Sequence, residues 1–211
     1  MRSLGPQRAD QAATPWILAS ESPRRIDLLR SAGQRFENEP SRVDESPRFG
    51  ESASELAARV ALDKARAVAA RNPQRWVLAA DTIVVVDRAP FGKPRDRAEA
   101  EAMLTRLSGR THEVVTAFVL VEPGGGTFIE RSILSEVVFR TLAAEEIVAY
   151  VAGGEPLDKA GAYAIQGGAA GFVTEVRGSV SNVIGLPMAE VEAALRTAGL
   201  WISLDGSALP T

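Results

Sequence analysis

The chain has 211 residues, of which 45% are hydrophobic and 24% are charged, so it is long enough to bury the core of one domain. Its formal net charge of −3 argues against a general nucleic-acid-binding protein, which usually needs a basic surface, but it allows a local basic pocket for a small anion. Because the chain contains no cysteine, disulfides, thiolate metal sites and cysteine nucleophiles are excluded.

No apolar run approaches the roughly 18 to 20 residues that a membrane span requires. The first residues are polar and lack the apolar stretch of a secretory signal. We therefore expect residues 1–14 to be a disordered leader and residues 15–211 to form a single domain. We also expect a cytoplasmic protein without a nucleic-acid or membrane partner.

The first elements follow from a short apolar run and from capping residues. "WILAS" predicts a buried strand over residues 16–20. A helix should follow, with Ser22 as its N-cap, Pro23 at its first position and Gly33 at its end. The acidic, proline-containing residues 37–50 predict a loop.

A second helix should run from Ser52 to about residue 71, because Ser52 and Glu55 form a capping box. "RWVLAAD" then predicts a strand that ends on Asp81. "TIVVVD" continues in an extended conformation, and its apolar character indicates burial on both faces. "FGKPRD" predicts a turn.

The second half of the chain continues the alternation. Asp96 should cap a helix that ends at Gly109, and residues 111–139 predict two long strands joined by a glycine-rich turn. The remaining predictions are a helix over 143–152, a glycine-rich loop over 155–171, a hairpin-like stretch, and a helix from Pro187 to Gly199. Alternating strands and helices with one hairpin predict an α/β fold with a mixed sheet flanked by helices.

The turn "LASESPRR" places serines and arginines at the start of the first helix. Free N–H groups and the helix dipole favour an anion there, Ser20 can add a hydroxyl, and Arg24 and Arg25 suit phosphate oxygens. The simpler interpretation is a capped helix with solvated arginines. That interpretation is less favourable, because cations belong at the C-terminus of a helix. The residues alone moderately favour a phosphate site.

Lys64 lies on the apolar stripe of the second predicted helix, in the i, i+4 series with Leu56 and Val60. Such a lysine either extends along the surface to water, which is the commoner outcome, or points into a cavity. Asp81, at the predicted strand end, lies where α/β folds place ligands, although a turn cap formed with Thr82 is the ordinary alternative. Lys93 in "GKP" is only a weak turn signal, because no P-loop pattern surrounds it.

Three further polar residues indicate a function only if other polar residues lie near them in the fold. Glu45 in "VDES" is solvated by default, but together with Asp81 it could hold Mg²⁺ or Mn²⁺. Gln166 lies in a loop of small residues, and its amide offers a donor and an acceptor that suit the edge of a nucleobase. His112 is the only histidine, so we interpret it as structural.

Together these segments resemble the Maf family of nucleoside triphosphate pyrophosphatases. The resemblance extends from about Trp16 to Leu200 and consists of eight pieces in family order. They are "LASESPRR", "VDES", "ALDKA", "AADTIVVVD", "GKP", "LSGRTHEVVT", "KAGAYAIQG" and "GSVSNVIGLP". The form "AYAIQG" is similar to the branch that acts on dTTP and UTP. The branch that prefers methylated GTP typically carries a Ser-Glu-Gly-like sequence there.

The resemblance implies an inosine triphosphatase-like fold, with two lobes around a central nucleotide-binding cleft. It also implies hydrolysis between the α and β phosphates, with Asp81 as the proton acceptor or metal ligand and Glu45 sharing the metal. The triphosphate would be held by Ser20, Arg24, Arg25, Lys64 and Lys93. Arg24, Thr82 and Gln166 match the positions associated with base preference. Relatives are often dimeric, so a homodimer is expected.

Two alternatives remain open at this point. The chain could be a nucleotide-binding regulator of septum formation with little turnover, since the Maf name is tied to inhibition of septation. It could also be a pyrophosphatase for methylated GTP. Completeness of the site favours an enzyme, because a pure binder has no need for Asp81, Glu45 and two lysines together.

Overall fold

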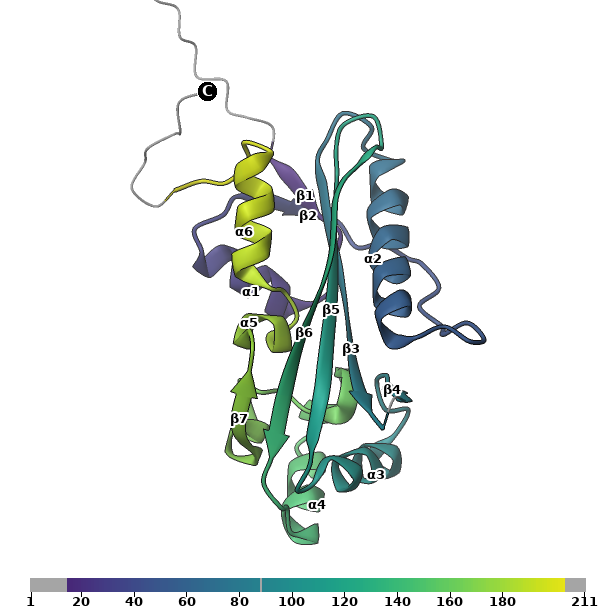
Figure 1. Cartoon of the computed structure of the whole chain (residues 1–211), viewed down its shortest axis with the longest axis vertical. Helices are drawn as coiled ribbons and strands as arrows, with labels where there is room; N and C mark the ends of the chain where they lie inside the picture. Colours follow the sequence, from purple (N-terminus) through teal and green to yellow (C-terminus); the bar gives the residue numbers. More distant parts are fainter. Residues whose placement is uncertain (1–14, 88, 204–211) are drawn as a thin grey trace, which may run out of the picture.

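The computed structural model describes residues 15–87 and 89–203 (Figure 1). The predicted leader, residues 1–14, and residues 204–211 of the predicted domain lie outside the described residues. Within the two described ranges, no helix is long and apolar enough to cross a membrane.

The described residues contain one mixed sheet of seven strands. The strands are β1 (Trp16–Leu18), β2 (Phe36–Asn38), β3 (Val77–Val86), β4 (Ala89–Phe91), β5 (Thr111–Val121), β6 (Thr127–Phe139) and β7 (Val173–Arg177). Their order is β2-β1-β3-β5-β6-β7, with β4 also paired to β3. β1 is parallel to β2 and β3, whereas the other pairs are antiparallel. The predicted α/β class with a mixed sheet is confirmed.

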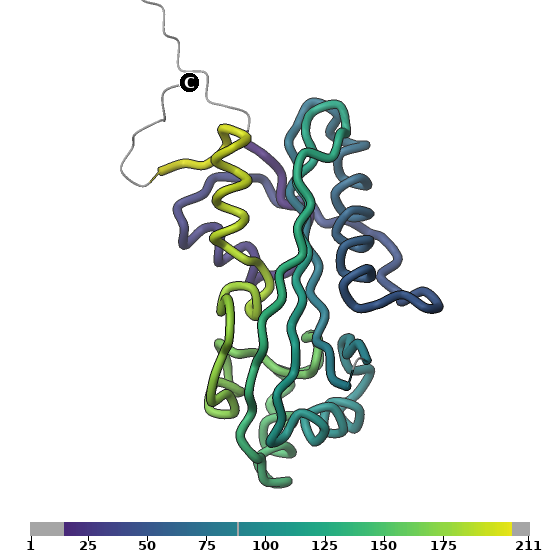
Figure 2. Tube along the Cα trace, viewed as in Figure 1, coloured from purple at the N-terminus to yellow at the C-terminus, as the bar shows by residue number. Residues whose placement is uncertain are grey.

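Helices cover both faces of the sheet and one of its ends (Figure 1). The α-helices are α1 (Pro23–Ser31), α2 (Ala53–Ala69), α3 (Arg97–Leu107), α4 (Ala144–Ala152), α5 (Val180–Ile184) and α6 (Met188–Thr197). Short 3-10 helices are η1 (Glu155–Asp158), η2 (Ala160–Ala162) and η3 (Gly168–Phe172). The long β5–β6 ribbon joins an upper lobe, with β1, β2, α1, α2 and α6, to a lower lobe, with β4, β7, α3 and α4 (Figures 1 and 2).

The alternation of side chains along β3 assigns each face of the sheet to its own helices. Val77 and Ala79 belong to the core that includes α2, whereas Leu78 and Ala80 belong to the core that includes α1 and α6. A third core around Phe139 fills the lower lobe between α3 and α4. Because both faces of β3 are covered, the strand is buried on both sides, as its apolar sequence predicts.

Helix starts follow the predicted caps with one exception. Ser52 Oγ accepts a hydrogen bond from the Glu55 backbone N–H, and the Glu55 carboxylate accepts one from the Ser52 N–H, so the capping box of α2 is confirmed. Asp96 caps α3 through Oδ1, which accepts a hydrogen bond from the Glu99 backbone N–H at 2.8 Å. Ser22 occupies the N-cap of α1, but its side chain makes no capping bond. Its N–H donates instead to Ser20 Oγ at 3.1 Å.

The structure corrects the predicted elements at several points. Residues 37 and 38, at the start of the predicted loop, belong with Phe36 to the edge strand β2, which pairs with β1, and the rings of Phe36 and Trp16 stack with centroids 5.0 Å apart. The strand predicted to end on Asp81 continues unbroken to Val86, because β5 pairs with it on both sides of this residue. The predicted loop over 155–171 contains the 3-10 helices. The hairpin-like stretch after it is β7 followed by α5.

Candidate active site

The candidate site lies at a gap in the sheet, on one edge of β3. β1 pairs with β3 only at Val77 and Leu78, and β4 pairs with it only from Val84 onwards. Between these pairings, no strand in the described part of the chain lies beside the β3 edge that carries Asp81 and Thr82. The C-terminal end of β1 points to this gap, where α/β sheets usually bind ligands.

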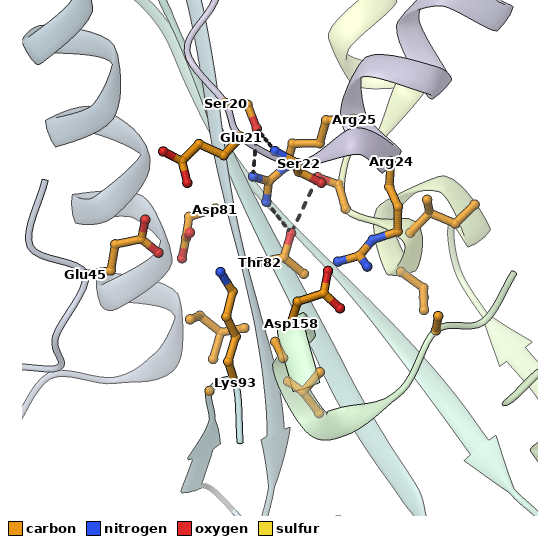
Figure 3. Close-up of a pocket in the computed structure, with 18 of the residues that line it drawn as sticks. Ser20, Glu21, Ser22, Arg24, Arg25, Glu45, Asp81, Thr82, Lys93 and Asp158 are labelled. Carbon is orange, nitrogen blue, oxygen red and sulfur yellow. Dashed lines mark hydrogen bonds between the residues drawn. The ribbon is translucent and has the colours of Figure 1, made fainter. Parts of the chain in front are cut away.

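A cavity of about 540 Å³ occupies this gap between the two lobes, a size within the roughly 300–1,000 Å³ typical of small-molecule sites. Residues of the upper lobe and of the lower lobe face each other across it (Figure 3). All the site residues predicted from the sequence line this one cavity: Ser20, Arg24, Arg25, Glu45, Lys64, Asp81, Thr82, Lys93 and Gln166. Their roles stay predictions.

Lys64 bridges two carboxylates inside the cavity. Its Nζ lies 2.8 Å from Asp81 Oδ1 and 2.9 Å from Glu45 Oε1. Lys64 and Asp81 are both only 7% exposed, whereas the Glu45 side chain is half-exposed. Asp81 falls on the face of β3 that packs against α2, which explains why the two side chains meet. Lys64 therefore points into the cavity rather than along the surface.

The carboxylates of Asp81 and Glu45 provide the donor set for the predicted divalent metal. Across the described residues, no group of three or more acidic or histidine side chains is arranged to hold a metal ion. Mg²⁺, however, usually binds through one or two carboxylates, with water and substrate phosphates completing its shell. Lys64 Nζ contacts only one oxygen of each carboxylate. The residues present therefore fit a Mg²⁺ or Mn²⁺ ion that binds together with a polyphosphate.

Arg25 is held by the protein itself. Its guanidinium donates to Gly185 O at 2.7 Å, to Thr82 Oγ1 at 2.9 Å and to Ser20 Oγ at 3.4 Å. Burial lowers the pKa of Arg25 from its ordinary value and the charge of Asp81 opposes that shift, yet the group stays cationic in the physiological range. Arg25 thus adds positive charge to the cavity while connecting α1, β3 and α5.

Thr82 lies on the opposite face of β3 from Asp81. Its hydroxyl is 2.9 Å from Thr116 Oγ1, which in turn donates to the backbone oxygen of Asn182 in α5. The segment "GSVSNVIGLP" therefore builds the wall of the cavity behind Arg25 and Thr82. Sequence reasoning assigned this segment no role, because its contacts join residues more than 60 positions apart.

Arg24, Lys93 and Gln166 are the predicted side chains that are accessible for a ligand. Arg24 is partly exposed and extends into the cavity, and the exposed Lys93 points into it from the opposite lobe (Figure 3). Lys93 makes no hydrogen bond or ion pair with any other residue that the structure describes. Gln166 is exposed between η2 and η3 and also lines the cavity.

Among the cavity residues that the sequence analysis missed, Asp158 and Tyr163 have polar side chains with defined contacts. Asp158 points into the cavity toward Arg24 (Figure 3), and its carboxylate lies 2.6 Å from Lys159 Nζ. Although burial opposes the shift, the hydrogen bond from Lys159 keeps the pKa of Asp158 below its ordinary value. Tyr163 is buried and also lines the cavity. The "DKAGAY" sequence before Gln166 was the available signal for both.

His112 lies outside the cavity lining, as expected for a structural histidine. It is 2% exposed, and its Nε2 lies 2.8 Å from the hydroxyl of Tyr163. Burial lowers the pKa of His112 to about 4, so the ring is neutral near pH 7. It therefore contributes no charge to the site.

A cleft between two α/β lobes, with cations on both walls and a buried carboxylate at its centre, can bind a small polyanion and hold a water molecule beside it. The family model described as "Maf-like protein" matches residues 15–198 of the chain. The protein belongs to the Maf family, as the sequence motifs predict.

Relatives at about half identity cover almost the whole chain. A dTTP/UTP pyrophosphatase of Geobacter metallireducens is 49% identical over 183 residues, which are 87% of this chain and 95% of that protein. A dTTP/UTP pyrophosphatase of Myxococcus xanthus is 50% identical over 192 residues, 91% of this chain and 95% of that protein. Among solved structures, the Ham1 protein of Staphylococcus aureus aligns with a TM-score of 0.46 at 15% identity, covering 87% of this chain and 99% of that one.

Proposed function

We propose that this protein is a nucleoside triphosphate pyrophosphatase that hydrolyses dTTP and UTP, together with modified pyrimidine nucleotides, to the monophosphate and pyrophosphate. Relatives that are 46 to 50% identical over most of the chain carry the name dTTP/UTP pyrophosphatase. The observation that carries the proposal is the cavity itself. It joins the buried Lys64–Asp81 pair to the accessible cations Arg24 and Lys93.

In the proposed reaction, a water oxygen bonds to the α-phosphorus, and the bond from that phosphorus to the bridging oxygen breaks. Pyrophosphate leaves with the electron pair, and Asp81 accepts the proton from the water. Lys64 fixes the orientation of Asp81. Arg24, Lys93 and the free N–H groups at the start of α1 neutralise the phosphate oxygens, whose charge shifts toward the leaving group.

A divalent ion held by Asp81 and Glu45 would polarise the phosphoryl oxygens and neutralise part of their charge. Asp81 could then serve as a metal ligand as well as a proton acceptor. Gln166 would bind the edge of the base, since its amide can both donate to and accept from uracil or thymine. Location in the cytoplasm and a homodimeric state belong to the same proposal on the strength of the family resemblance.

Substitution of Asp81 tests the proposal directly. In an assay of pyrophosphate release from dTTP and UTP with Mg²⁺ or Mn²⁺, Asp81→Asn should lower turnover by about 10²- to 10⁴-fold, the range for loss of a general base. Asp63→Asn is the matched control, because Asp63 belongs to the same helix as Lys64 but lies outside the cavity lining. It should retain normal turnover.

Three outcomes would contradict the proposal. Undiminished turnover in a clean Asp81→Asn preparation would exclude the catalytic role of this residue. A panel of canonical and modified triphosphates tests the substrate class, and faster release of pyrophosphate from methylated GTP than from dTTP or UTP would move the chain to the other branch of the family. Tight nucleotide binding with negligible turnover of every triphosphate would favour the regulatory alternative.

A further inference from the structure

The segment that leads to Gln166 has a constrained backbone. Gly161 and Ala162 both have positive φ values, of 72° and 60°, which are costly for a residue with a side chain such as Ala162. A Cβ at Gly161 would lie 2.9 Å from Cγ2 of Val84 in β3. The segment is thus pressed against the strand that carries Asp81. Such a conformation persists only where neighbouring contacts hold it.

Tyr163 provides the contact that ties this segment to the sheet. Its hydroxyl lies 2.8 Å from Nε2 of His112 in β5, and its ring packs edge-on against Phe139 at a centroid distance of 4.9 Å. His112 Nδ1 is buried without a partner among the described residues. The hydroxyl of Tyr163 is therefore the one hydrogen-bond partner that this histidine ring has in the described structure.

A purely apolar core does not need this pair. A phenylalanine at position 163 would fill the same space. The buried hydroxyl and imidazole instead give up their hydrogen bonds to water for one hydrogen bond to each other, which contributes only about 0.5 to 1.5 kcal/mol net to stability. What the bond adds is geometry. Tyr163 lies three residues before Gln166 on the same short segment, and both residues line the cavity, so the bond fixes the backbone that leads to Gln166.

We propose that Tyr163 and His112 act as a positioning pair, which holds Gln166 at the distance and angle that select the nucleobase. The proposal rests on the proposed function for the identity of the ligand. It adds to nucleotide selection two residues that act through the placement of Gln166. Loss of the bond should weaken discrimination between pyrimidines more than it weakens the chemical step.

The test compares UTP with CTP, whose base edges exchange a donor for an acceptor. Tyr163→Phe keeps the ring and removes only the hydroxyl. It should raise KM for UTP and dTTP, leave kcat nearly unchanged, and lower the UTP-to-CTP ratio of kcat/KM by about tenfold, the effect of losing one well-placed hydrogen bond. Gln166→Glu, which alters the base contact directly, should change the same ratio.

Two controls separate positioning from stability. Gln34→Leu removes buried hydrogen bonds to Ala32 and Ile202, far from the cavity, and should lower Tm without changing the ratio. In the double variant His112→Phe/Tyr163→Phe both polar partners are replaced, so Tm should recover while the ratio stays low. An unchanged ratio in Tyr163→Phe, or a ratio restored in the double variant, would overturn the proposal.

Base selection can also be measured without turnover, as a ratio of binding constants. The Kd values of α,β-methylene UTP and α,β-methylene CTP report base selection even if the wild-type chain hydrolyses neither nucleotide. Absent hydrolysis by the wild type contradicts the proposed function. If Tyr163→Phe loses selectivity equally in binding and in turnover, the positioning pair is supported. If Tyr163→Phe binds the two analogues with wild-type selectivity, the proposal is contradicted.

Discussion

The burial of Lys64 is unfavourable for the isolated helix but becomes favourable in the folded protein, where carboxylates pair with its charge. Its place on the apolar stripe of α2 buries a cation, which is costly unless that cation is paired. Asp81 and Glu45 supply the pairing at 2.8 and 2.9 Å. The same bonds fix the carboxylate to which we assign proton transfer. In the proposed function, stability and catalysis thus depend on the same pair.

Removal of the lysine charge should therefore destabilise the fold. Lys64→Met leaves Asp81 buried without its cation, and loss of one partner of a buried pair typically costs about 3 to 5 kcal/mol. The free energy of unfolding, measured by urea denaturation, should fall by that order. Lys64→Met/Asp81→Asn should recover much of the loss, because no uncompensated charge remains.

An exposed ion pair provides the matched control. Arg95 pairs with Glu99 at 2.8 Å, but its side chain is 84% exposed. Arg95→Met should change the free energy of unfolding far less than Lys64→Met does, because solvent screens a surface pair. Equal losses in Arg95→Met and Lys64→Met would refute the idea that the cavity pair is important for stability.

At this scale the sequence identified most of the candidate site. Each predicted residue carried a chemical signal, such as a lysine on an apolar stripe, and each lines the cavity. The environment of Arg25 could not be predicted. Its bonds to Thr82 and Gly185 span 57 and 160 positions, and they bury a guanidinium that the sequence suggested was available for phosphate. Local patterns contain no information on such distant partners.

At the scale of elements, the gap beside β3 is the feature that creates the site. The strand runs on through Asp81, supported by β5 on one edge, while its other edge changes partner from β1 to β4. η2 comes close to this gap, since Gly161 fits against Val84 only because it has no side chain. A glycine is needed here for space and for conformation together.

Gly161→Ala tests this fit. With φ at +72° and a Cβ 2.9 Å from Val84, the substitution should destabilise the protein by about 1 to 3 kcal/mol, and it should impair turnover by moving the segment of Gln166. Thermal unfolding and pyrophosphate release measure the two effects. Gly171→Ala, at a glycine with open space and no positive φ, should change neither by much. A harmless Gly161→Ala would contradict the close packing.

Most elements were predictable, and the exceptions have physical causes. Capping boxes and apolar periodicity act locally, so α2 and α3 begin where the sequence indicates. β2 could not be predicted, because its three residues are strand-like only through pairing with β1. Only the predicted strand end at Asp81 was wrong, because this acidic residue interrupts an apolar run, whereas the extended conformation predicted for residues 82–86 is confirmed as part of the same strand.

At the scale of the whole molecule, the single histidine makes stability sensitive to mild acid. Burial lowers the pKa of His112 from 6.5 to about 4, so the folded state keeps the ring neutral where the unfolded state binds a proton. The neutral His112 ring contributes fully to the free energy of unfolding above pH 6.5, and this contribution is lost as the pH falls from 6.5 toward 4. The carboxylates of Glu51 and Glu146, whose pKa values are lowered by Arg59 and Arg140 from 4.5 to about 2, lose their stabilising contribution mainly below pH 4.5, so the range from pH 6.5 to 5 isolates His112 from these two groups.

We expect the free energy of unfolding to fall by about 3 kcal/mol between pH 6.5 and pH 4, since each pKa unit corresponds to about 1.4 kcal/mol. Urea denaturation at intervals of half a pH unit measures this slope. The double variant His112→Phe/Tyr163→Phe contains no histidine and should show a flat profile from pH 6.5 to 5. A wild-type profile that is equally flat would show that His112 is not protected from protonation.

The edge strands at the two ends of the sheet limit where another copy of the chain can add a strand. β2 is three residues long with Glu37 and Asn38 exposed, and β7 carries the exposed charges of Glu175 and Arg177. Short, charged margins discourage strand addition by a neighbouring molecule. The β3 margin beside Asp81 is enclosed between the lobes, whereas β6 has no strand partner among the described residues on its outer edge from Thr127 to Ser135, because β7 pairs only from Glu136 onwards. Strand addition is thus disfavoured at β2, at β7 and at the β3 margin, and the outer edge of β6 is the part of the sheet where a neighbouring strand could pair.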